Sequence, residues 1–286
     1  MNSPIPVTVI GGYLGSGKTT LVNHLLRNAN GKRLAIMVNE FGELAIDEDL
    51  IEASSENMIS LAGGCVCCSF GSDLIAAMQE LARMEPVPDN VILEASGVAL
   101  PGAIAGTLSL LPGFALDGVL VLADAETVRQ TAADKYMADT ITRQLSDADI
   151  VLLNKTDLVS ETELVELRVW LPQFAPDAQV IETQRSVLNP VVVLQNFMLP
   201  EHSAYDGPFQ HVDGFETRRL DVNECVDALG FAEELIRENP GLVRAKGFVR
   251  DNDGSTKTIQ IVGQRYEISA APEGVNTGLV LIAKVM

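Results

Sequence analysis

Eight residues near the start of the chain constrain its fold more than any other feature. Gly12–Thr19 (GYLGSGKT) fits the pattern G-x-x-x-x-G-K-[ST]. A strand-like apolar run, Pro6–Ile10, precedes it, and a helical pattern, Lys18–Arg27, follows it. A phosphate-binding loop needs this context, because it joins a strand to the N-terminus of a helix. The pattern therefore predicts a P-loop in an α/β domain.

The residue types of this loop suit the binding of a nucleotide's phosphates. Glycines let the backbone curl so that successive N–H groups point at phosphate oxygens, and the helix dipole adds to the attraction. We expect Lys18 to bridge the β- and γ-phosphates, Thr19 to place its hydroxyl on Mg²⁺ and Thr20 to contact the α-phosphate. The expected phosphate-binding residues are Gly12, Gly15, Ser16, Gly17, Lys18, Thr19 and Thr20.

Strand-like and helical runs alternate over residues 1–200, which predicts a mostly parallel sheet with helices on both faces. The expected strands are Arg33–Val38, Met58–Leu61, Asn90–Leu93, Gly118–Leu122 and Asp149–Leu153. The expected helices are Ser72–Met84, Met137–Leu145 and Glu161–Trp170, and the runs Gln179–Ile181 and Val191–Phe197 complete the set.

A polar segment rich in Pro and Gly predicts a linker over residues 201–214. Beyond it, Phe215–Val222, Val243–Val249, Thr256–Val262 and Leu279–Val285 are expected to be strands, and Glu224–Glu238 a helix whose apolar face holds Cys225. Residues 215–286 would then form a small C-terminal α+β domain beside the nucleotide-binding domain of residues 1–200.

A second motif indicates which base is bound. Asn154–Asp157 (NKTD) follows the predicted strand Asp149–Leu153 and fits N-K-x-D. The Asp157 carboxylate can accept hydrogen bonds from guanine N1–H and the exocyclic amine, whereas adenine would leave it unpaired. We expect the Asn154 amide to reach the other edge of the base and the Lys155 stem to cover one face.

Glu94–Gly97 (EASG) ends another predicted strand. Glu94 could hold Mg²⁺ through a water or orient the attacking water, although an ordinary carboxylate at a strand end is the alternative. Gly97 lets the backbone approach the γ-phosphate. We expect Asp124, which ends a further strand, to be structural. The expected catalytic residues are Lys18, Thr19 and Glu94.

Three of the four cysteines, Cys65, Cys67 and Cys68, lie within four residues after two glycines. Cysteines this close in sequence are poorly placed to form stabilising disulfides, whereas their thiolates are ligands for Zn²⁺ and related transition metals. Three local thiolates leave the fourth position open or filled from elsewhere, which suits a metal that is handed on. Redox chemistry and simple packing remain the alternatives.

Composition limits the partners. The chain has 20 Lys+Arg against 39 Asp+Glu, a formal charge of −19, which argues against nucleic acid or an anionic membrane as the main partner. No apolar run approaches the ~18 residues that a membrane span needs, and residues 1–10 lack the basic region of a signal peptide. We therefore expect a soluble, cytoplasmic protein.

Together these motifs resemble the CobW-type family of P-loop GTPases, whose members act as metal chaperones or insertases. The family's signatures follow one another in order over nearly the whole chain: GGYLGSGKTT (Gly11–Thr20), VNEFGE (Val38–Glu43), GGCVCC (Gly63–Cys68), EASG (Glu94–Gly97), LLNKTDLV (Leu152–Val159) and RAKGF (Arg244–Phe248). The resemblance implies that residues 39–47 form the first switch segment, that Glu40 and Glu43 share a metal with the cysteines, and that Asp47 senses Mg²⁺.

The chain also departs from the family. Ala45 stands where a Gly is usual and Leu100 where an Asp often follows EASG. A His-rich tract is absent, and the three histidines are His24, expected to pack or lie at the surface, and His202 and His211 in the linker, which we do not expect to be metal ligands.

The resemblance implies a GTPase that uses GTP/GDP with magnesium and binds zinc or cobalt at the CxCC site. It would deliver this metal to a client metalloprotein recognised by the C-terminal domain. The alternative is a nucleotide-dependent metal- or redox-sensing module with negligible turnover. A small-molecule kinase is disfavoured, because guanine selectivity is unusual in that class.

Overall fold

The computed structural model describes residues 4–29, 31–38, 58–62, 72–194, 210–212, 214–272 and 274–285. The chain forms two compact units, Met1–Pro190 and Val191–Met286, and each is described by itself.

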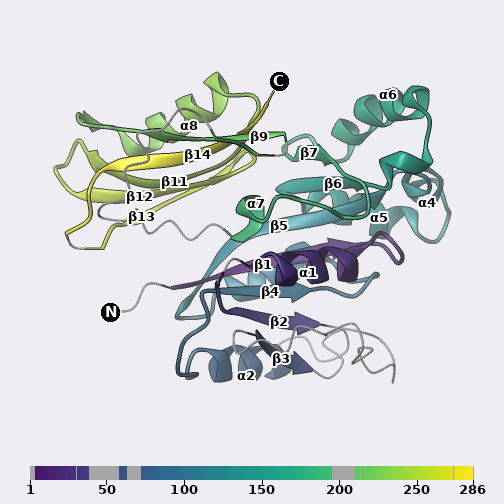
Figure 1. Ribbon diagram of the computed structural model, residues 1–286, viewed down its shortest axis with the longest axis horizontal. Helices are drawn as coiled ribbons and strands as arrows, with labels where there is room; N and C mark the ends of the chain where they lie inside the picture. Colours follow the sequence, from purple (N-terminus) through teal and green to yellow (C-terminus); the bar gives the residue numbers. More distant parts are fainter. Residues whose placement is uncertain are drawn as a thin grey trace. The chain divides into compact units, whose positions relative to one another are not determined.

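The first unit is built on a parallel sheet in the order β3-β2-β4-β1-β5-β6-β7 (Figure 1). Every neighbouring pair in it is parallel, which confirms the predicted α/β class. Its strands are β1 (Ile5–Gly12), β2 (Leu34–Val38), β3 (Met58–Ala62), β4 (Asn90–Glu94), β5 (Phe114–Asp124), β6 (Ile150–Asn154) and β7 (Gln179–Glu182).

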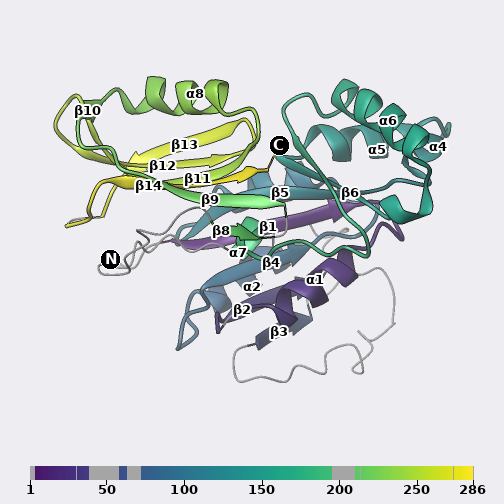
Figure 2. The same ribbon diagram turned by 45° about the horizontal axis from the view of Figure 1, so that its top comes forward.

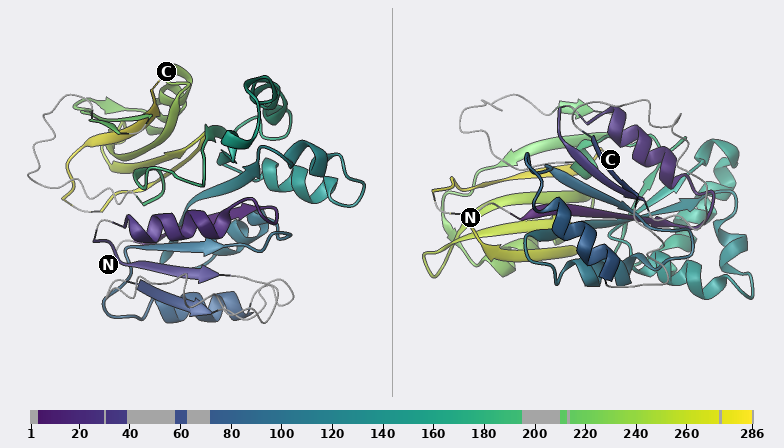
Figure 3. Two further views of the ribbon diagram at one scale, coloured as in Figure 1. Left: turned by 45° about the vertical axis from the view of Figure 1, so that its right-hand side comes forward. Right: turned by 90° about the horizontal axis from the view of Figure 1, so that it is seen from below.

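Helices cover both faces of this sheet. Figure 3 (right) shows α1 (Lys18–Arg27) and α2 (Ser72–Leu81) on opposite sides of the strands. Successive side chains of β1 point to opposite faces of the sheet, and Val7 and Val9 lie on the face that packs against α2. That core also takes residues from α3 (Pro101–Leu108), α4 (Val128–Ala132), α5 (Ala138–Ser146) and α6 (Glu161–Trp170). Short 3₁₀ turns, η2 (Thr156–Leu158) and η3 (Leu171–Gln173), flank α6.

The strand register gathers the motifs at one edge of the sheet. Because the strands are parallel, their carboxyl ends lie side by side. Ile10 is opposite Glu94, Gly12 is opposite Leu122, and Asp124 is opposite Asn154. The phosphate loop, the EASG motif and the N-K-x-D motif therefore start from neighbouring strand ends.

The second unit begins with a short helix, α7 (Val191–Leu194), and contains an antiparallel sheet in the order β13-β12-β11-β14-β9-β8. Helix α8 (Ala228–Glu238) packs on one face, where its residues share a core with Ala245, Ile259 and Leu281 (Figure 2). The strands are β8 (Gln210–Val212), β9 (Phe215–Leu220), β11 (Leu242–Asp251), β12 (Thr256–Val262), β13 (Arg265–Ala270) and β14 (Gly278–Lys284), with β10 (Cys225–Val226) pairing in parallel with β11.

Two expectations for this unit were wrong. Cys225 is exposed and lies in β10, not on a buried helical face. The helix starts only at Ala228, because the Asp227 side chain caps it by accepting a hydrogen bond from Gly230 N–H. In addition, residues 210–212, expected in the linker, form strand β8 against β9.

Candidate nucleotide-binding site

The phosphate loop has a backbone path that depends on glycine. Gly12, Gly15 and Gly17 all have positive φ, at 129°, 73° and 104°. At Gly17 a Cβ would lie 2.4 Å from Ser186 Oγ and 2.6 Å from Asn154 Nδ2. Glycine at this position is therefore required both by conformation and by the approach of two polar side chains.

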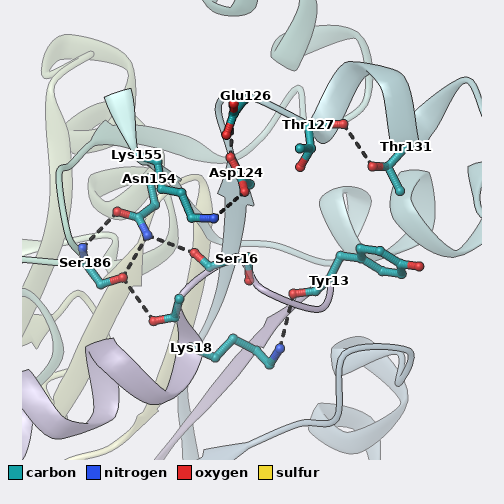
Figure 4. A network of polar contacts seen from close by, with 11 residues as sticks. Tyr13, Ser16, Lys18, Asp124, Glu126, Thr127, Thr131, Asn154, Lys155 and Ser186 are labelled. Atoms are coloured by element: carbon teal, nitrogen blue, oxygen red, sulfur yellow. Dashed lines mark hydrogen bonds and ion pairs between the residues drawn. The ribbon is translucent and has the colours of Figure 1, made fainter. Parts of the chain in front are cut away.

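The loop ends at the N-terminus of α1. No side chain caps this helix, since Gly17 occupies the N-cap position, and its first turn holds no acidic residue. The first N–H groups and the positive end of the helix dipole are thus available to an anion. Lys18 is 9% exposed, and its Nζ donates to the Tyr13 carbonyl oxygen at 3.3 Å, across the mouth of the loop (Figure 4).

A hydroxyl and a carboxylate meet beside the loop. Thr19 Oγ1 donates to Glu94 Oε1 at 2.8 Å. Glu94 ends β4 and is 4% exposed. Oxygen donors of these two types are the ones that Mg²⁺ prefers, and the hydroxyl oxygen keeps its lone pairs while it donates. The pair therefore fits the magnesium ion that a nucleotide triphosphate brings.

The EASG motif continues into a tight turn at the same edge of the sheet. Ala99 N–H donates to the Ser96 carbonyl oxygen at 3.0 Å. Gly97 is buried against the phosphate loop, so that a Cβ on it would lie 2.5 Å from Leu14 Cδ2 and 2.9 Å from Leu14 N. Within the described part of the chain, the N–H groups of Gly97 and Val98 donate no hydrogen bond.

A buried side chain from α5 holds this turn from the other side. Gln144 Nε2 donates to the carbonyl oxygens of Gly97, at 3.2 Å, and Ala99, at 2.8 Å. Gln144 is 1% exposed. Ile141 and Leu145 lie on the same buried face of α5 as Gln144. Their packing in the core therefore turns the Gln144 side chain inward.

The Asn154 side chain ties three segments together (Figure 4). Its Nδ2 donates to the Ser16 carbonyl oxygen and to Ser186 Oγ, both at 2.8 Å. Its Oδ1 accepts from Ser186 N–H at 2.8 Å, and Ser186 Oγ donates to the Gly17 carbonyl oxygen at 3.0 Å. Both N–H donors of Asn154 are therefore used within the protein. The geometry favours a role in joining loops over the expected contact with the base edge.

The rest of the N-K-x-D motif turns outward. Lys155 has φ 63°, and its Nζ lies 2.6 Å from Asp124 Oδ2. The other carboxylate oxygen of Asp124 accepts from Glu126 N–H at 3.0 Å. Asp157 lies in η2 and is exposed. Asp124 therefore holds the Lys155 side chain in place, in line with the structural role expected for it. The Asp157 carboxylate faces solvent.

Gln144 and Ser186 are residues of this site that no sequence motif predicts. Ser186 follows β7, at the same strand edge as the motifs, and it has φ 55° beside Arg185 at 52°. Two successive non-glycine residues with positive φ indicate a backbone held by its surroundings. For Ser186 the one local indication in the sequence is that it follows a predicted strand. Gln144 gave no signal, since its partners lie more than forty positions earlier.

The expected metal ligands Cys65, Cys67, Cys68, Glu40, Glu43 and Asp47 lie outside the described residues, as does His202. Among the residues that are described, no group of three His, Cys, Asp or Glu side chains has the arrangement of a metal site. His24 Nε2 donates to the Leu188 carbonyl oxygen at 2.8 Å, so this ring serves packing. Thr20 is exposed on α1.

No helix in the described ranges combines the length and the apolar character needed to cross a bilayer.

Comparison with known proteins places this geometry in a family. Residues 6–182 match the family model of the CobW/HypB/UreG nucleotide-binding domain. The chain is 34% identical to a protein from Sinorhizobium sp. called zinc chaperone CobW, with 92% of this chain and 86% of that protein covered. It is also 34% identical to zinc-regulated GTPase metalloprotein activator 1 of Schizosaccharomyces pombe, with 94% and 78% covered.

Among solved structures, Zn(II)-bound YjiA GTPase from Escherichia coli is similar at 27% identity and a TM-score of 0.48, with 99% of this chain and 95% of that chain covered. The family-model match extends from the first strand through β7 and so includes every motif of the site described above. The chain belongs to the CobW-type family of P-loop GTPases.

Proposed function

We propose that this GTPase is a metallochaperone, which binds a transition metal at Cys65, Cys67 and Cys68 and hands it to a client metalloprotein in a GTP-dependent cycle. Zinc is the favoured metal, because two relatives aligned over more than nine tenths of this chain are named a zinc chaperone and a zinc-regulated activator. Cobalt remains the second choice, since thiolates bind both ions.

The observation that carries the nucleotide part of the proposal is the Asn154 tie. By bonding to Ser16 and Ser186, Asn154 keeps the N-K-x-D turn beside the phosphate loop before any ligand arrives. One nucleotide can then have its phosphates at Gly12–Thr19 and its base at Asp157. Preorganisation of this kind lowers the entropy cost of binding.

The phosphate loop supplies positive character where the γ-phosphate would lie. Lys18 would exchange its contact with Tyr13 for the β- and γ-phosphates, and the α1 N-terminus would receive the remaining oxygens. Thr19 and Glu94 fit a magnesium ion, directly or through water, and this ion neutralises charge on the phosphates. Glu94 would orient the attacking water. Most of the rate enhancement then comes from positioning and electrostatics.

The free N–H groups of Gly97 and Val98 fit the same picture. A buried backbone N–H without a partner is costly, so native proteins rarely keep one unless a ligand meets it. In the described structure neither group has an acceptor. Gly97 is buried beside Leu14 of the phosphate loop, so the cost of an unpaired buried N–H falls on Gly97, whereas Val98 is 48% exposed. We assign them to the γ-phosphate, whose presence they would sense.

Guanine selection is assigned to Asp157 and Lys155. Asp157 is exposed, so its carboxylate is open to the two donors of guanine. Lys155 is held by Asp124 at 2.6 Å, which fixes the position of its stem beside the base. Adenine offers no matching donor pair, so ATP should bind more weakly.

The metal part of the proposal rests on the residue types of the CxCC sequence and on the relatives. Glu40 and Glu43 are proposed to complete the coordination shell when GTP is bound, and Asp47 to sense magnesium. The proposed client contact is the C-terminal unit, and the proposed compartment is the cytoplasm, where thiols stay reduced.

Two titrations test the chaperone cycle. Zinc or cobalt is titrated into the protein bound to GDP and into the protein bound to a non-hydrolysable GTP analogue. We expect tighter metal binding with the analogue, by a coupling of roughly 1–3 kcal/mol, and linkage requires the metal to tighten the analogue by the same factor. Glu43→Gln should shrink this coupling while GDP affinity stays unchanged.

The control for the metal site is Cys67→Ser, which replaces a thiolate with a neutral hydroxyl. Bound cobalt should give an intense thiolate-to-metal charge-transfer band in the wild type and a weaker one in this variant. Equal metal affinity in both nucleotide states would sink the chaperone cycle. Tight GTP binding without turnover would support a sensing module instead.

A further inference from the structure

We propose that Gln144 is a positioning residue for GTP hydrolysis, which holds the carbonyls of the 97–99 turn so that the turn's N–H groups face the γ-phosphate. The inference rests on the proposed function of the nucleotide site. It adds to that site a side chain from α5, a helix that contains none of the recognised nucleotide-binding motifs.

The contacts place α5 as the support of this turn. The Gln144 amide donates both of its recorded hydrogen bonds to the turn, to the carbonyl oxygens of Gly97 and Ala99. One helical turn later, Asp147 Oδ2 accepts from Gly102 N–H at 2.9 Å, at the start of α3. Gln144 and Asp147 therefore hydrogen-bond to three backbone groups of the segment that follows Glu94: two carbonyl oxygens and one N–H.

The direction of the N–H groups follows from peptide geometry. In a trans peptide the C=O and the N–H point in opposite directions. The Gly97 carbonyl points at Gln144, so the Val98 N–H in the same peptide points away from α5. The Ser96 carbonyl accepts from Ala99 N–H, which likewise fixes the direction of the Gly97 N–H. With these carbonyls occupied, both N–H groups stay available to a ligand.

The turn also lies against the phosphate loop. Gly97 approaches Leu14 so closely that a Cβ would lie 2.9 Å from the Leu14 backbone nitrogen. The turn is thus held between the phosphate loop and Gln144. A shift of the Gly97 peptide, once released from Gln144, would move its neighbouring N–H groups relative to the γ-phosphate.

The chemistry of the site selects a primary amide at position 144. Two carbonyl oxygens need two N–H donors, and a glutamine amide supplies both. Glutamate would place a carboxylate, without a donor when ionised, beside these carbonyls in a site only 1% exposed. Methionine has a similar length and would fill the space without donating.

The experiment compares the wild type with Gln144→Met and Gln144→Glu. We measure kcat and KM for GTP, together with the affinities for GDP and for a non-hydrolysable GTP analogue. Gln144→Met should lower kcat by about 10- to 100-fold, the effect expected from a slightly misplaced reactive group. GDP affinity should change less than about threefold, because GDP has no γ-phosphate for the turn to contact. The affinity for the GTP analogue should be weakened, so the analogue-to-GDP affinity ratio should fall.

Thr142→Ala is the matched control, because Thr142 lies on the same helix and its hydroxyl donates to the Ala138 and Asp139 carbonyl oxygens within α5. It should leave kcat and the affinity ratio unchanged. A merely structural role for Gln144 would lower the melting temperature without changing the affinity ratio, which overturns the inference.

The variants separate the possible failures. If Gln144→Met does not fold, the same measurements on Gln144→Glu decide the matter, and unchanged kcat and affinity ratio in either folded variant refute the inference. A wild type that does not hydrolyse GTP refutes the proposed function instead. Hydrolysis that is equal in the wild type and Gln144→Met refutes only the role of Gln144.

Discussion

Asn154→Ala should destabilise the first unit even when no nucleotide is bound. The Asn154 side chain is 2% exposed and makes three hydrogen bonds at 2.8 Å to Ser16 and Ser186. Alanine would leave the Ser186 N–H and the Ser16 carbonyl without their partner in a buried site. Each buried group left without a partner costs roughly 1–3 kcal/mol, so the free energy of unfolding should fall by about 2–6 kcal/mol.

Urea unfolding of the nucleotide-free protein measures this change. Trp170 is the single tryptophan of the chain, and it packs against the core of the first unit with its ring centroid 4.7 Å from that of Phe174. Its fluorescence therefore reports the unfolding of that unit alone.

Two further variants sharpen the measurement. Asn154→Asp keeps an acceptor for the Ser186 N–H but cannot donate to the Ser16 carbonyl, so it should also destabilise. Asn28→Ala removes an exposed asparagine that bonds to the His24 carbonyl, and it should cost less than about 1 kcal/mol. A change below about 0.5 kcal/mol for Asn154→Ala would refute the idea that Asn154 holds the two loops together.

Two other variants address the ligand. Lys18→Ala should abolish GTP hydrolysis and leave the urea midpoint close to that of the wild type, because the proposed partners of Nζ are the phosphates of the nucleotide; normal turnover in a folded variant would remove Lys18 from the site. Asp157→Asn should weaken GTP and relatively favour xanthosine triphosphate, whose C2 carbonyl accepts from the new amide. Competition binding with equal affinity for ATP and GTP in the wild type would contradict the guanine assignment.

Local patterns in the sequence predicted the elements that carry strong end signals. The predicted bounds of α1 and α6 agree with the structure. For α1 the glycines of the phosphate loop mark the start, and for α6 Ser160 and Glu163 form a capping box. The parallel sheet followed from alternation, because buried parallel strands are continuous apolar runs.

Elements without such signals were missed. Helix α3 has the sequence PGAIAGTL, which contains two glycines and no charged residue, so it offers no amphipathic pattern. The apolar pattern predicts too early a start for α8, because it does not reveal the cap formed by Asp227, and it therefore predicts Cys225 on a buried face.

The site was predictable only as far as its motifs reach. The phosphate loop and Glu94 lie together as the strand pattern indicates. Contacts between distant segments gave no local signal: Gln144 with Gly97, and Ser186 with Asn154. For Asn154 the motif suggested a contact with the base, whereas burial and the available acceptors commit its donors to the protein.

The absent side chain of Gly17 has a consequence for how nucleotide preference can change. The space in which a Cβ would stand is where Ser186 Oγ and Asn154 Nδ2 meet. A larger residue there would disturb the phosphate loop and the 154–157 turn at once, because Asn154 bonds to both Ser16 and Ser186. Under the proposed guanine assignment, a change toward another purine is therefore easier at the exposed Asp157, which takes no part in this contact.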